Sequence, residues 1–364
     1  MKIHDFAVIG AGMAGASLAA ELADSASVLL LEAEDAPGYH ATGRSAAFWE
    51  ECYGGPDIVP LTLASGPYLA EHDFLNRRGA LYVARDEDIS ALDEFMNSFA
   101  DTGVNIVHWG GESVKRRLPG VQLQWTAAAW EPACADIDVA ALHAHYLRLG
   151  RSRGVRLQTR AGVVGLDRTD GVWHIQTADG QHHRATCIVN AAGAWADRVA
   201  VLAGAKPIGI APLRRTVVQL RTDPAPPADM PLVLDVNGRF YFKPDAGRLW
   251  LSPQDEVPSE PGDAAPEELA VAEAIALLEE VVDWRIEAVE RRWAGLRSFA
   301  PDRRPVYGFD PQAEGFAWFA GQGGFGIQTA PAAARLGSQL LLGNARDAMT
   351  AELDAALYAP SRFV

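Results

Sequence analysis

The first 32 residues contain the sequence feature that most constrains the fold of this chain. Residues 3–9 end in an apolar run and predict a buried strand, residues 16–23 predict a helix, and residues 28–31 predict a second buried strand. The sequence Gly-Ala-Gly-Met-Ala-Gly fills residues 10–15 between the first strand and the helix, and Glu32 follows the second strand. This order of elements predicts a Rossmann-type unit that binds a dinucleotide.

Each part of this motif has a physical role. Gly10 permits a tight turn, Gly12 lets the backbone approach a pyrophosphate, and Gly15 lets the helix pack closely on the strand. The helix N-terminus offers free N–H groups and a positive dipole end to phosphates. Glu32 is placed to accept hydrogen bonds from ribose hydroxyls, and its charge would repel the 2′-phosphate of NADP. The full context disfavours a glycine-rich turn without a ligand, but the motif does not distinguish FAD from NAD.

Length and charge narrow the class of protein. A chain of 364 residues exceeds what one core usually organises, so we expect two domains. Apolar residues make up 49% of the chain, which is typical of a folded globular protein. The chain has 47 acidic and 32 basic residues and a net charge of −15, which argues against nucleic acid and anionic membranes as general partners.

The cysteines and one apolar segment bear on the compartment. Cys52, Cys134 and Cys187 lie too far apart for a zinc motif or a redox pair, and an odd number leaves no complete disulfide set. We therefore expect no metal site and a cytoplasmic protein. Residues 6–20 superficially resemble a signal peptide, but they are shorter than a membrane helix and the glycine motif explains them better. We expect no integral membrane segment.

Three later segments also offer backbone groups to a cofactor. Residues 38–47 are rich in small residues, and residues 190–195 (Asn-Ala-Ala-Gly-Ala-Trp) follow a strand predicted at 185–189. Residues 315–320 predict a strand, after which an open glycine loop leads into a helix that begins near Thr329 and runs to about Leu342. The N-terminus of that helix would stabilise negative charge on a reduced flavin. In isolation, each segment also fits an ordinary strand-loop-helix connection.

Taken together, these motifs resemble the D-amino-acid oxidase superfamily of FAD enzymes, and they occur in the family order along nearly the whole chain. The resemblance is strongest to bacterial FAD-dependent D-amino-acid dehydrogenases, particularly those that act on D-arginine. The segments that carry it are GAGMAG (10–15), Glu32, HATGRSAA (40–47), NAAGAW (190–195), AGLRSF (294–299) and GQGGFGIQT (321–329). It implies an α/β fold, α+β overall, with a Rossmann-type FAD-binding domain and a second, antiparallel-sheet substrate-binding domain.

The expected division of the chain follows from this resemblance. The FAD-binding domain is expected to comprise residues 1–75, 135–206 and 294–364, and the substrate-binding domain residues 76–134 and 207–293.

Within the second domain, residues 79–84, 217–220 and 240–242 predict strands. A helix is predicted from about Pro266 to Val282, and Leu269, Ala272, Ala276 and Leu277 share one face of it. The acidic, proline-rich residues 253–268 are interpreted as a solvated connection, with a lid as the alternative.

The resemblance also implies non-covalent FAD. The C-terminal third has no cysteine for a cysteinyl linkage, and the dehydrogenases that this chain resembles have a histidine at the position of His40 yet bind FAD without a covalent bond. The residues expected to contact FAD are Gly10, Gly12, Ala14, Gly15, Glu32, Ala33, Thr42, Gly43, Arg44, Ser45, Ala46, Ala47, Val163, Ala192, Gly193, Trp195, Gly295, Gly323, Gly324, Phe325, Gly326, Ile327, Gln328 and Thr329.

Four side chains are expected to hold the substrate. In the resembling family, Arg297 matches the arginine that binds the substrate carboxylate, and Tyr241 matches a tyrosine whose hydroxyl assists it. Arg215 matches a second pocket arginine, although adjacent Arg214 leaves the register open, and Tyr53 matches a tyrosine that closes the pocket. Without the resemblance, solvent-facing arginines and core tyrosines would be the default interpretation. The further substrate-binding candidates are Phe48, Glu50, Gly324 and Gln328.

Three positions depart from the D-arginine-acting members. Ala80 stands where they have a glutamate, Phe48 where they have a histidine, and Glu50 where a small hydroxyl residue is usual. These differences argue against a strict preference for D-arginine and suit apolar side chains. Glu50 is interpreted as an outward-facing surface residue, with a replacement acid for basic substrates as the alternative.

The leading functional hypothesis is the oxidative deamination of D-amino acids to 2-oxo acids and ammonia, with hydride transfer from Cα to flavin N5 and a quinone or another electron acceptor. A glycine- or sarcosine-type amine oxidase and a 2-hydroxy-acid oxidoreductase are alternatives on the same scaffold. A non-catalytic flavoprotein subunit is an alternative of another class. An NAD-dependent dehydrogenase ranks last, because it leaves the C-terminal glycine loop unused.

Overall fold

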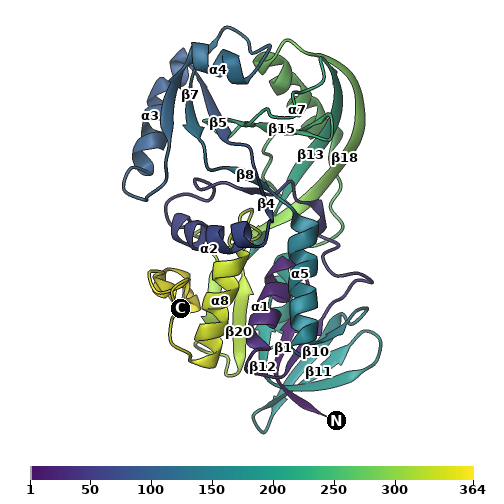
Figure 1. Ribbon diagram of the computed structural model, residues 1–364. Coiled ribbons are helices and arrows are strands. Elements are labelled where there is room, and N and C mark those ends of the chain that lie inside the picture. The colour runs from purple at the N-terminus through teal and green to yellow at the C-terminus, as the bar shows by residue number, and fades with distance from the viewer. Residues whose placement is uncertain (1) are drawn as a thin grey trace.

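The computed structural model describes residues 2–364 and contains two large sheets, which lie one above the other in Figure 1. The first sheet has the strand order β10-β11-β12-β1-β2-β9, and β20 pairs with β12 and β19. Its strands are β1 (Ile3–Ile9), β2 (Val28–Leu31), β9 (Arg156–Gln158), β10 (Val163–Thr169), β11 (Val172–Thr177), β12 (His182–Asn190), β19 (Val306–Phe309) and β20 (Phe316–Ala320). Strand β1 is parallel to β2 and β12, and β12 is parallel to β20, as the sequence predicts for a Rossmann-type sheet.

The central strands are apolar throughout because both faces of the sheet are covered. Phe6 and Val8 pack into one core with helices α1 and α8, whereas Ala7 and Ile9 pack on the other side with α6 and β11. Figure 1 shows α1, α5 and α8 side by side over the sheet. The helices of this part are α1 (Met13–Leu22), α5 (Val139–Ser152), α6 (Ala196–Leu202) and α8 (Ala330–Leu342).

The second sheet has ten strands in the order β21-β18-β13-β16-β15-β14-β5-β7-β6, with β17 at the side of β13. All its pairs are antiparallel except β14 with β5, which are parallel, so the predicted antiparallel sheet is correct apart from this pair. Its strands are β5 (Ala80–Arg85), β6 (Val107–Gly110), β7 (Trp125–Glu131), β13 (Ala211–Asp223), β14 (Leu232–Asp235), β15 (Tyr241–Asp245), β16 (Arg248–Ser252), β17 (Val257–Pro258), β18 (Arg285–Phe299) and β21 (Gln322–Gly323). Its helices are α3 (Ile89–Ser98), α4 (Gly111–Arg117) and α7 (Glu268–Val281). The mixed α/β fold class is thereby confirmed.

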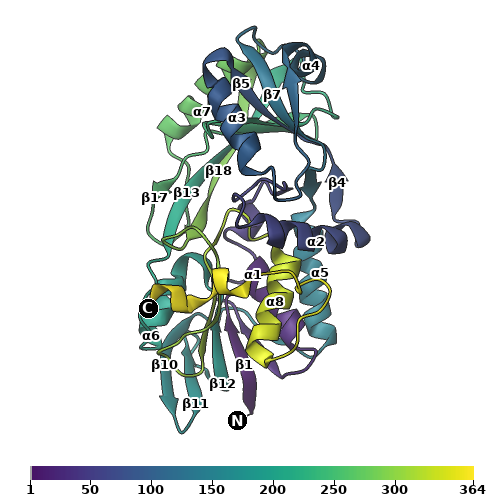
Figure 2. The ribbon, with the colours of Figure 1, turned by 90° about the vertical axis from the view of Figure 1, so that its left-hand side faces the viewer.

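Strands β13 and β18 connect the two parts of the molecule. They pair from Ala211 with Phe299 to Asp223 with Arg285, so both remain hydrogen-bonded along their whole length. Figures 1 and 2 show them running from the upper sheet toward the lower one. The expected boundary between residues 293 and 294 falls inside β18. We propose that the chain divides as expected into an FAD-binding and a substrate-binding part, with β18 shared by both.

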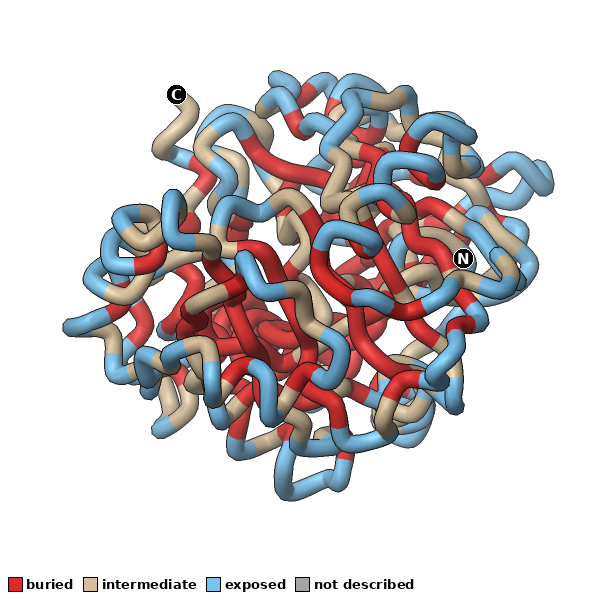
Figure 3. Tube along the Cα trace, turned by 90° about the horizontal axis from the view of Figure 1, so that it is seen from above, coloured by how far each residue is buried: buried red, intermediate tan, exposed pale blue. Residues whose placement is uncertain are grey.

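A smaller sheet lies between these parts and supports the loop at residues 50–55. Its strand order is β3-β8-β4, and helix α2 packs against α8 beside it. Its strands and the helix are β3 (Phe48–Trp49), β4 (Leu75–Arg77), β8 (Ala135–Ile137) and α2 (Val59–Glu71). Seen from above, the buried segments gather in the middle of the molecule (Figure 3). Among residues 2–364, no helix has both the length and the apolar character needed to cross a bilayer.

Helix α7 buries a different face from the predicted one. The side chains that reach the core are Ala270, Val271, Ala274, Leu278 and Val281. Leu269, which the sequence pattern placed on the shared apolar face with Ala272, Ala276 and Leu277, is 66% exposed. The prediction was wrong because the helix has alanines on two neighbouring stripes, and both stripes therefore look equally apolar in the sequence. Val271, Leu278 and Val281 pack into the core of the second sheet.

Replacing Gly15 with Ala tests the close contact between α1 and the turn before it. A Cβ atom at Gly15 would overlap the carbonyl oxygen of Gly10 and lie 3.0 Å from its carbonyl carbon. Overpacking of this kind costs about 1–3 kcal/mol. We expect Gly15→Ala to lower the free energy of unfolding by about that amount in urea titrations and to weaken retention of the bound cofactor. Gly162→Ala is the matched control, because its Cβ would meet Ala33 at an ordinary 3.5 Å. Equal stability of the two variants would contradict the prediction.

Candidate active site

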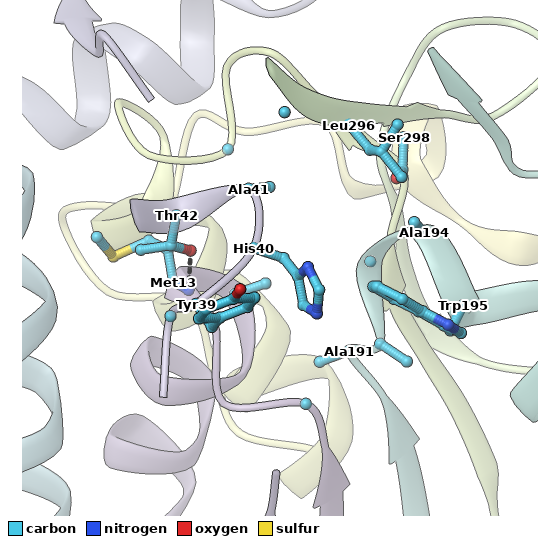
Figure 4. A pocket seen from close by; sticks show the side chains of 18 of the residues that line it. Met13, Tyr39, His40, Ala41, Thr42, Ala191, Ala194, Trp195, Leu296 and Ser298 are labelled. Atoms are coloured by element: carbon cyan, nitrogen blue, oxygen red, sulfur yellow. Dashed lines mark hydrogen bonds between the residues drawn. The ribbon is translucent and has the colours of Figure 1, made fainter. Parts of the chain in front are cut away.

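A cavity of about 590 Å³ lies where the two parts meet, and it brings most of the predicted motifs together. Its walls come from the glycine turn before α1, the loop at residues 38–46, the turn at 191–195, the end of β18 and the glycine loop after β20. Figure 4 shows side chains of these segments facing one another across the cavity. The predicted cofactor residues that line it are Gly10, Gly12, Ala14, Glu32, Ala33, Thr42, Arg44, Ser45, Ala46, Val163, Ala192, Gly193, Trp195, Gly295, Gly323, Gly324, Gly326 and Ile327.

One end of the cavity is lined mainly by backbone atoms of the turn before α1. Gly10 has a φ of +101°, and a Cβ atom there would lie 2.5 Å from the carbonyl oxygen of Ala191, so only glycine fits this turn. Glu32 holds its carboxylate toward the cavity through two backbone bonds: Ala11 N donates to Oε2 at 2.9 Å and Glu34 N to Oε1 at 3.0 Å. The result is a narrow cradle with a fixed acid at its edge, as a dinucleotide requires.

Thr42 connects the second cofactor loop to the start of helix α1. Its Oγ1 accepts a hydrogen bond of 2.9 Å from Met13 N, drawn as a dashed line in Figure 4. A Cβ atom at Gly12 would lie 3.2 Å from that same oxygen, so the missing side chain at Gly12 keeps the loop close to the helix. This contact was not predicted, because its partners are far apart in sequence.

Aromatic side chains flank the middle of the cavity. The ring of His40 lies 4.7 Å from that of Trp195 and 5.0 Å from that of Tyr39, and its Nε2 is 2.8 Å from Oε1 of Glu34. Figure 4 shows His40 between the two other rings. Arg44 lines the same region and donates to the carbonyl oxygen of Ala294 at 3.2 Å.

Arg297 and Tyr53 meet near Gly324 at the other end. Within residues 2–364, the guanidinium of Arg297 has no hydrogen-bond or ion-pair partner, and its Cζ lies 5.6 Å from the centre of the Tyr53 ring. The Tyr53 hydroxyl is buried without a hydrogen-bond partner in the described chain. Burial raises the pKa of Tyr53, and the charge of Arg297 partly offsets this effect. A free cation in the cavity wall, with a free hydroxyl beside it, can bind an anion.

The structure resolves the register of the two neighbouring arginines on β13. Arg215 lines the cavity and is 6% exposed, and burial followed by the charge of Arg297 lowers its pKa. Its Nε donates to the carbonyl oxygen of Asp255 at 2.9 Å and its Nη2 to Glu256 Oε1 at 3.2 Å. Arg214 lies outside the cavity lining.

Arg214 instead pairs through Nη1 with Glu267 at 2.5 Å. The acidic segment 253–268 is therefore anchored to arginines, and its residues Gly262 and Ala264 form part of the cavity wall. The segment connects β16 to α7, and the side chains of Asp263 and Glu267 are more than half exposed, as expected of a solvated connection. Their arginine partners, Arg44 and Arg214, were not predicted.

Tyr241 forms the wall opposite the loop at residues 50–55. It is 4% exposed, lines the cavity and meets Phe48 edge-to-face with ring centroids 5.5 Å apart. Phe48 is outside the cavity lining and supports Tyr241 from behind.

Glu50 corrects a sequence-based expectation. It is only 3% exposed, not an outward-facing surface residue, and the hydroxyl of Tyr82 donates to its Oε1. Burial raises the pKa of Glu50 to about 7, although the Tyr82 bond and the charge of Arg297 oppose the rise. The error arose because a single glutamate beside a two-residue strand gives no periodicity from which its direction can be inferred.

Gln328 does not line the cavity but supports the loop at residues 50–55. Its Oε1 accepts from Glu50 N at 3.2 Å, and its Nε2 donates to the carbonyl oxygen of Glu50 at 3.1 Å and to Thr62 Oγ1 at 2.9 Å. The side chain thus fixes the backbone that carries Glu50 and Tyr53. The other predicted residues outside the cavity lining are Gly15, Gly43, Ala47, Tyr53, Phe325 and Thr329.

Several wall residues were not predicted. Those adjacent to predicted motifs could have been found by extending each motif, such as Met13, Ala191, Leu296 and Ser298. Others come from elements without any motif, and no local signal identifies them: Arg198, Leu202, Val217, Gly262 and Ala264. Among residues 2–364, no group of three or more His, Cys, Asp or Glu side chains is arranged to hold a metal ion.

Comparison with known proteins identifies the family. A family model described as FAD dependent oxidoreductase matches residues 5–340. This chain belongs to the FAD-dependent oxidoreductase family. FAD-dependent oxidoreductase domain-containing protein 1 of Xenopus laevis is 21% identical over 396 residues, which cover 93% of this chain and 79% of that protein. L-2-hydroxyglutarate dehydrogenase of Escherichia coli K12 is 24% identical over 217 residues, 56% of this chain and 51% of that protein.

The fold is shared with solved flavoenzymes. Glycine oxidase from Geobacillus kaustophilus superposes with a TM-score of 0.86 at 21% identity, and the match covers the whole of both chains. The cofactor of this protein is FAD. The residues present fit it, because the cradle at Gly10 and Gly12 excludes side chains, Glu32 is fixed for a ribose, and the adjoining walls are small or aromatic.

Gly324→Ala tests the meeting point of Tyr53 and Arg297. A Cβ atom at Gly324 would overlap the Tyr53 hydroxyl and lie 2.7 Å from Tyr53 Cζ and 3.0 Å from Arg297 Cζ. Both groups would have to move. We therefore expect KM for the substrate that undergoes oxidation to rise about tenfold or more, while the flavin absorbance is retained. Gly110→Ala is the matched control, since nothing lies within 4 Å of its Cβ position. Unchanged kinetics in Gly324→Ala would show that this point is not part of the active site.

Proposed function

We propose that the protein oxidises an amino acid at its α-carbon, with D-amino acids as the substrates, and releases the 2-oxo acid and ammonia after hydrolysis of the imine. The observation that carries this proposal is the unpartnered Arg297 guanidinium in a cavity that also contains the FAD cradle. A partly buried cation without a protein hydrogen-bond or ion-pair partner is well suited to a carboxylate ligand. The motifs that resemble D-amino-acid dehydrogenases favour the D-configuration.

Each side chain near Arg297 has a proposed role in binding the substrate. Arg297 binds the carboxylate, and Tyr53 and Tyr241 donate their hydroxyls to it or to the amine. Arg215 adds positive potential at the same end, while its bonds to Asp255 and Glu256 keep it in place. FAD, when bound, supplies the two-electron oxidation of the substrate C–H bond. Positioning of the α-carbon, and loss of the ammonium proton beforehand, are the tasks left to the protein.

The substrate side chain is expected to be apolar. Tyr241 lines the cavity, and Phe48 and the fully buried Ala80 lie outside its lining but in the same apolar cluster as Tyr241. Small or branched apolar D-amino acids therefore suit this end of the site.

The oxidation of a 2-hydroxy acid is the second candidate function. The similarity to L-2-hydroxyglutarate dehydrogenase favours it, and a hydroxy acid offers Arg297 the same carboxylate. A non-catalytic flavoprotein would not need an unpartnered arginine in the cavity wall with an unpartnered tyrosine hydroxyl beside it. We further propose a cytoplasmic location and a quinone or another acceptor as the oxidant, in keeping with three free, buried cysteines.

Anaerobic spectra of the purified protein test the proposed reaction. We expect D-leucine and other apolar D-amino acids to bleach the flavin absorbance, and L-amino acids and glycine to do so much less. Bleaching by 2-hydroxy acids alone would replace the proposal with its second candidate.

The variant Arg297→Met tests the carboxylate receptor. Loss of a charge-assisted bond costs about 1.5–3 kcal/mol, so we expect KM for D-leucine to rise by about ten- to a hundredfold with the flavin still bound. Arg214→Met is the matched control, because Arg214 neighbours Arg215 yet lies outside the cavity. Equal effects of the two substitutions would contradict the assignment of Arg297.

The attachment of FAD can be tested separately. His40 is held by Glu34 and Trp195, and we propose that it makes no covalent bond to the flavin. After acid precipitation, FAD is expected in the supernatant and the pellet is expected to be colourless. Yellow colour that stays with the pellet would show a covalent linkage.

A further inference from the structure

Residues 260–266 form a stretch of the cavity wall that lies outside the predicted motifs. They read Glu-Pro-Gly-Asp-Ala-Ala-Pro and lie between β17 and α7. Gly262 and Ala264 line the cavity. The two acidic side chains of the stretch face solvent, since those of Glu260 and Asp263 are 91% and 65% exposed. The stretch is therefore a thin part of the wall, with the cavity on one side and solvent on the other.

Both ends of this stretch are fixed to β13. Before it, strand β17 pairs with β13, and Ser259 N donates to the carbonyl oxygen of Pro212 at 3.0 Å. After it, Glu267 pairs with Arg214 of β13, and α7 packs into the core of the second sheet. The stretch is thus anchored to the second sheet at both ends.

The middle of the stretch is held to the other side of the cavity by side chains. Arg44 pairs with Asp263, and its Nη1 donates to the carbonyl oxygen of Ala264 at 3.0 Å. Arg198 of α6 pairs with Glu260 at 2.9 Å, and both arginines line the cavity. Among residues 2–364, no backbone–backbone hydrogen bond involves residues 260–266. The polar contacts of the middle therefore all come from side chains.

These side-chain contacts are easier to break than the contacts at the two ends. Ion pairs between exposed groups stabilise a fold only slightly, and salt screens them. Pro261 and Pro266 restrict the backbone near each end of the stretch. The middle can therefore separate from Arg44 and Arg198 while the ends remain on β13.

We propose that residues 260–266 form a strap that has to lift from Arg44 and Arg198 before FAD can leave or enter the cavity. The inference rests on the proposed non-covalent attachment of FAD, and it does not depend on which substrate is oxidised. The ion pairs join protein groups to one another, so they are broken and remade in both directions of FAD exchange. They therefore slow release and entry by the same factor and leave the affinity for FAD nearly unchanged.

Release of FAD from the holoprotein tests the strap without any substrate. The variant Asp263→Asn removes the charge that pairs with Arg44 and keeps the size of the side chain. After dilution at low salt, we expect FAD fluorescence to show release about threefold to fivefold faster than from the wild type. The dissociation constant of FAD, obtained from the fraction released over a dilution series, is expected to change by less than about twofold.

Glu314→Gln is the matched control. Glu314 forms an exposed ion pair with Arg168 at 2.8 Å, and neither residue lines the cavity. We expect this variant to release FAD at the wild-type rate. Equal release rates for Asp263→Asn and Glu314→Gln would overturn the proposal. A dissociation constant that rises as much as the release rate would also overturn it, because Asp263 would then stabilise bound FAD instead of holding a strap.

The salt dependence of release provides a second measurement. We expect an increase from about 0.05 to about 0.5 M NaCl to speed release from the wild type roughly threefold, because salt screens the ion pairs. The same increase is expected to have little effect on the double variant Glu260→Gln/Asp263→Asn, in which both pairs are already lost. An equal salt effect on the two proteins would count against the strap.

The failure of this inference can be distinguished from a failure of the proposed reaction. If FAD leaves neither the wild type nor any variant, the strap has nothing to retain and the proposal is wrong. Yellow colour in the acid-precipitated pellet would then identify a covalent linkage as the cause. Bleaching of the flavin by D-amino acids would still be observed in that case, so the proposed oxidation would stand.

Discussion

The antiparallel pairing of β13 with β18 is the interaction on which the rest of the active site depends. Their pairing places Leu213 opposite Arg297 and Arg215 opposite Gly295, so one pair of strands carries two of the arginines that line the cavity. Strands fix their side chains more rigidly than loops do. Because the pair extends from the second sheet to the FAD cradle, the strand that carries Arg297 also forms part of the cofactor wall.

The arginines on this strand pair differ in whether an acidic side chain neutralises them. Arg214 and Arg215 are neutralised by the acidic segment 253–268, whose residues close one side of the cavity. Arg297 has no such partner in the described chain, and this asymmetry reserves its charge for a ligand. Partial burial of an unpaired cation costs some free energy, and binding of an anion offsets this cost. On the far side, Glu50 and Glu131 are buried acids that lack a cation of their own.

Sequence reasoning reached the parts of this site that local patterns specify. The turn at Gly10, the acid at Glu32 and the helix that follows the C-terminal glycine loop are each fixed by a few consecutive residues, and their elements were predicted correctly. It failed where long-range packing decides. The direction of the Glu50 side chain depends on Tyr82, and the anchoring of segment 253–268 depends on β13. Neither contact can be inferred from the residues adjacent in sequence. The apolar face of α7 was missed for the related reason that alanine fits either side of a helix.

The two ends of the cavity are built from different kinds of groups. This difference explains why comparison with related proteins identifies the cofactor but not the substrate. The FAD end is formed by backbone and glycines, which tolerate few substitutions, and the fold is shared with a solved structure at 21% identity. The proposed substrate end is formed by side chains on the β13–β18 pair and on β15, with the loop at residues 50–55 beside it. Such side chains can change without disturbing the cradle. Glu50 and Phe48 lie on that loop and the strand before it, so the chemistry that distinguishes this chain within its family is expected there.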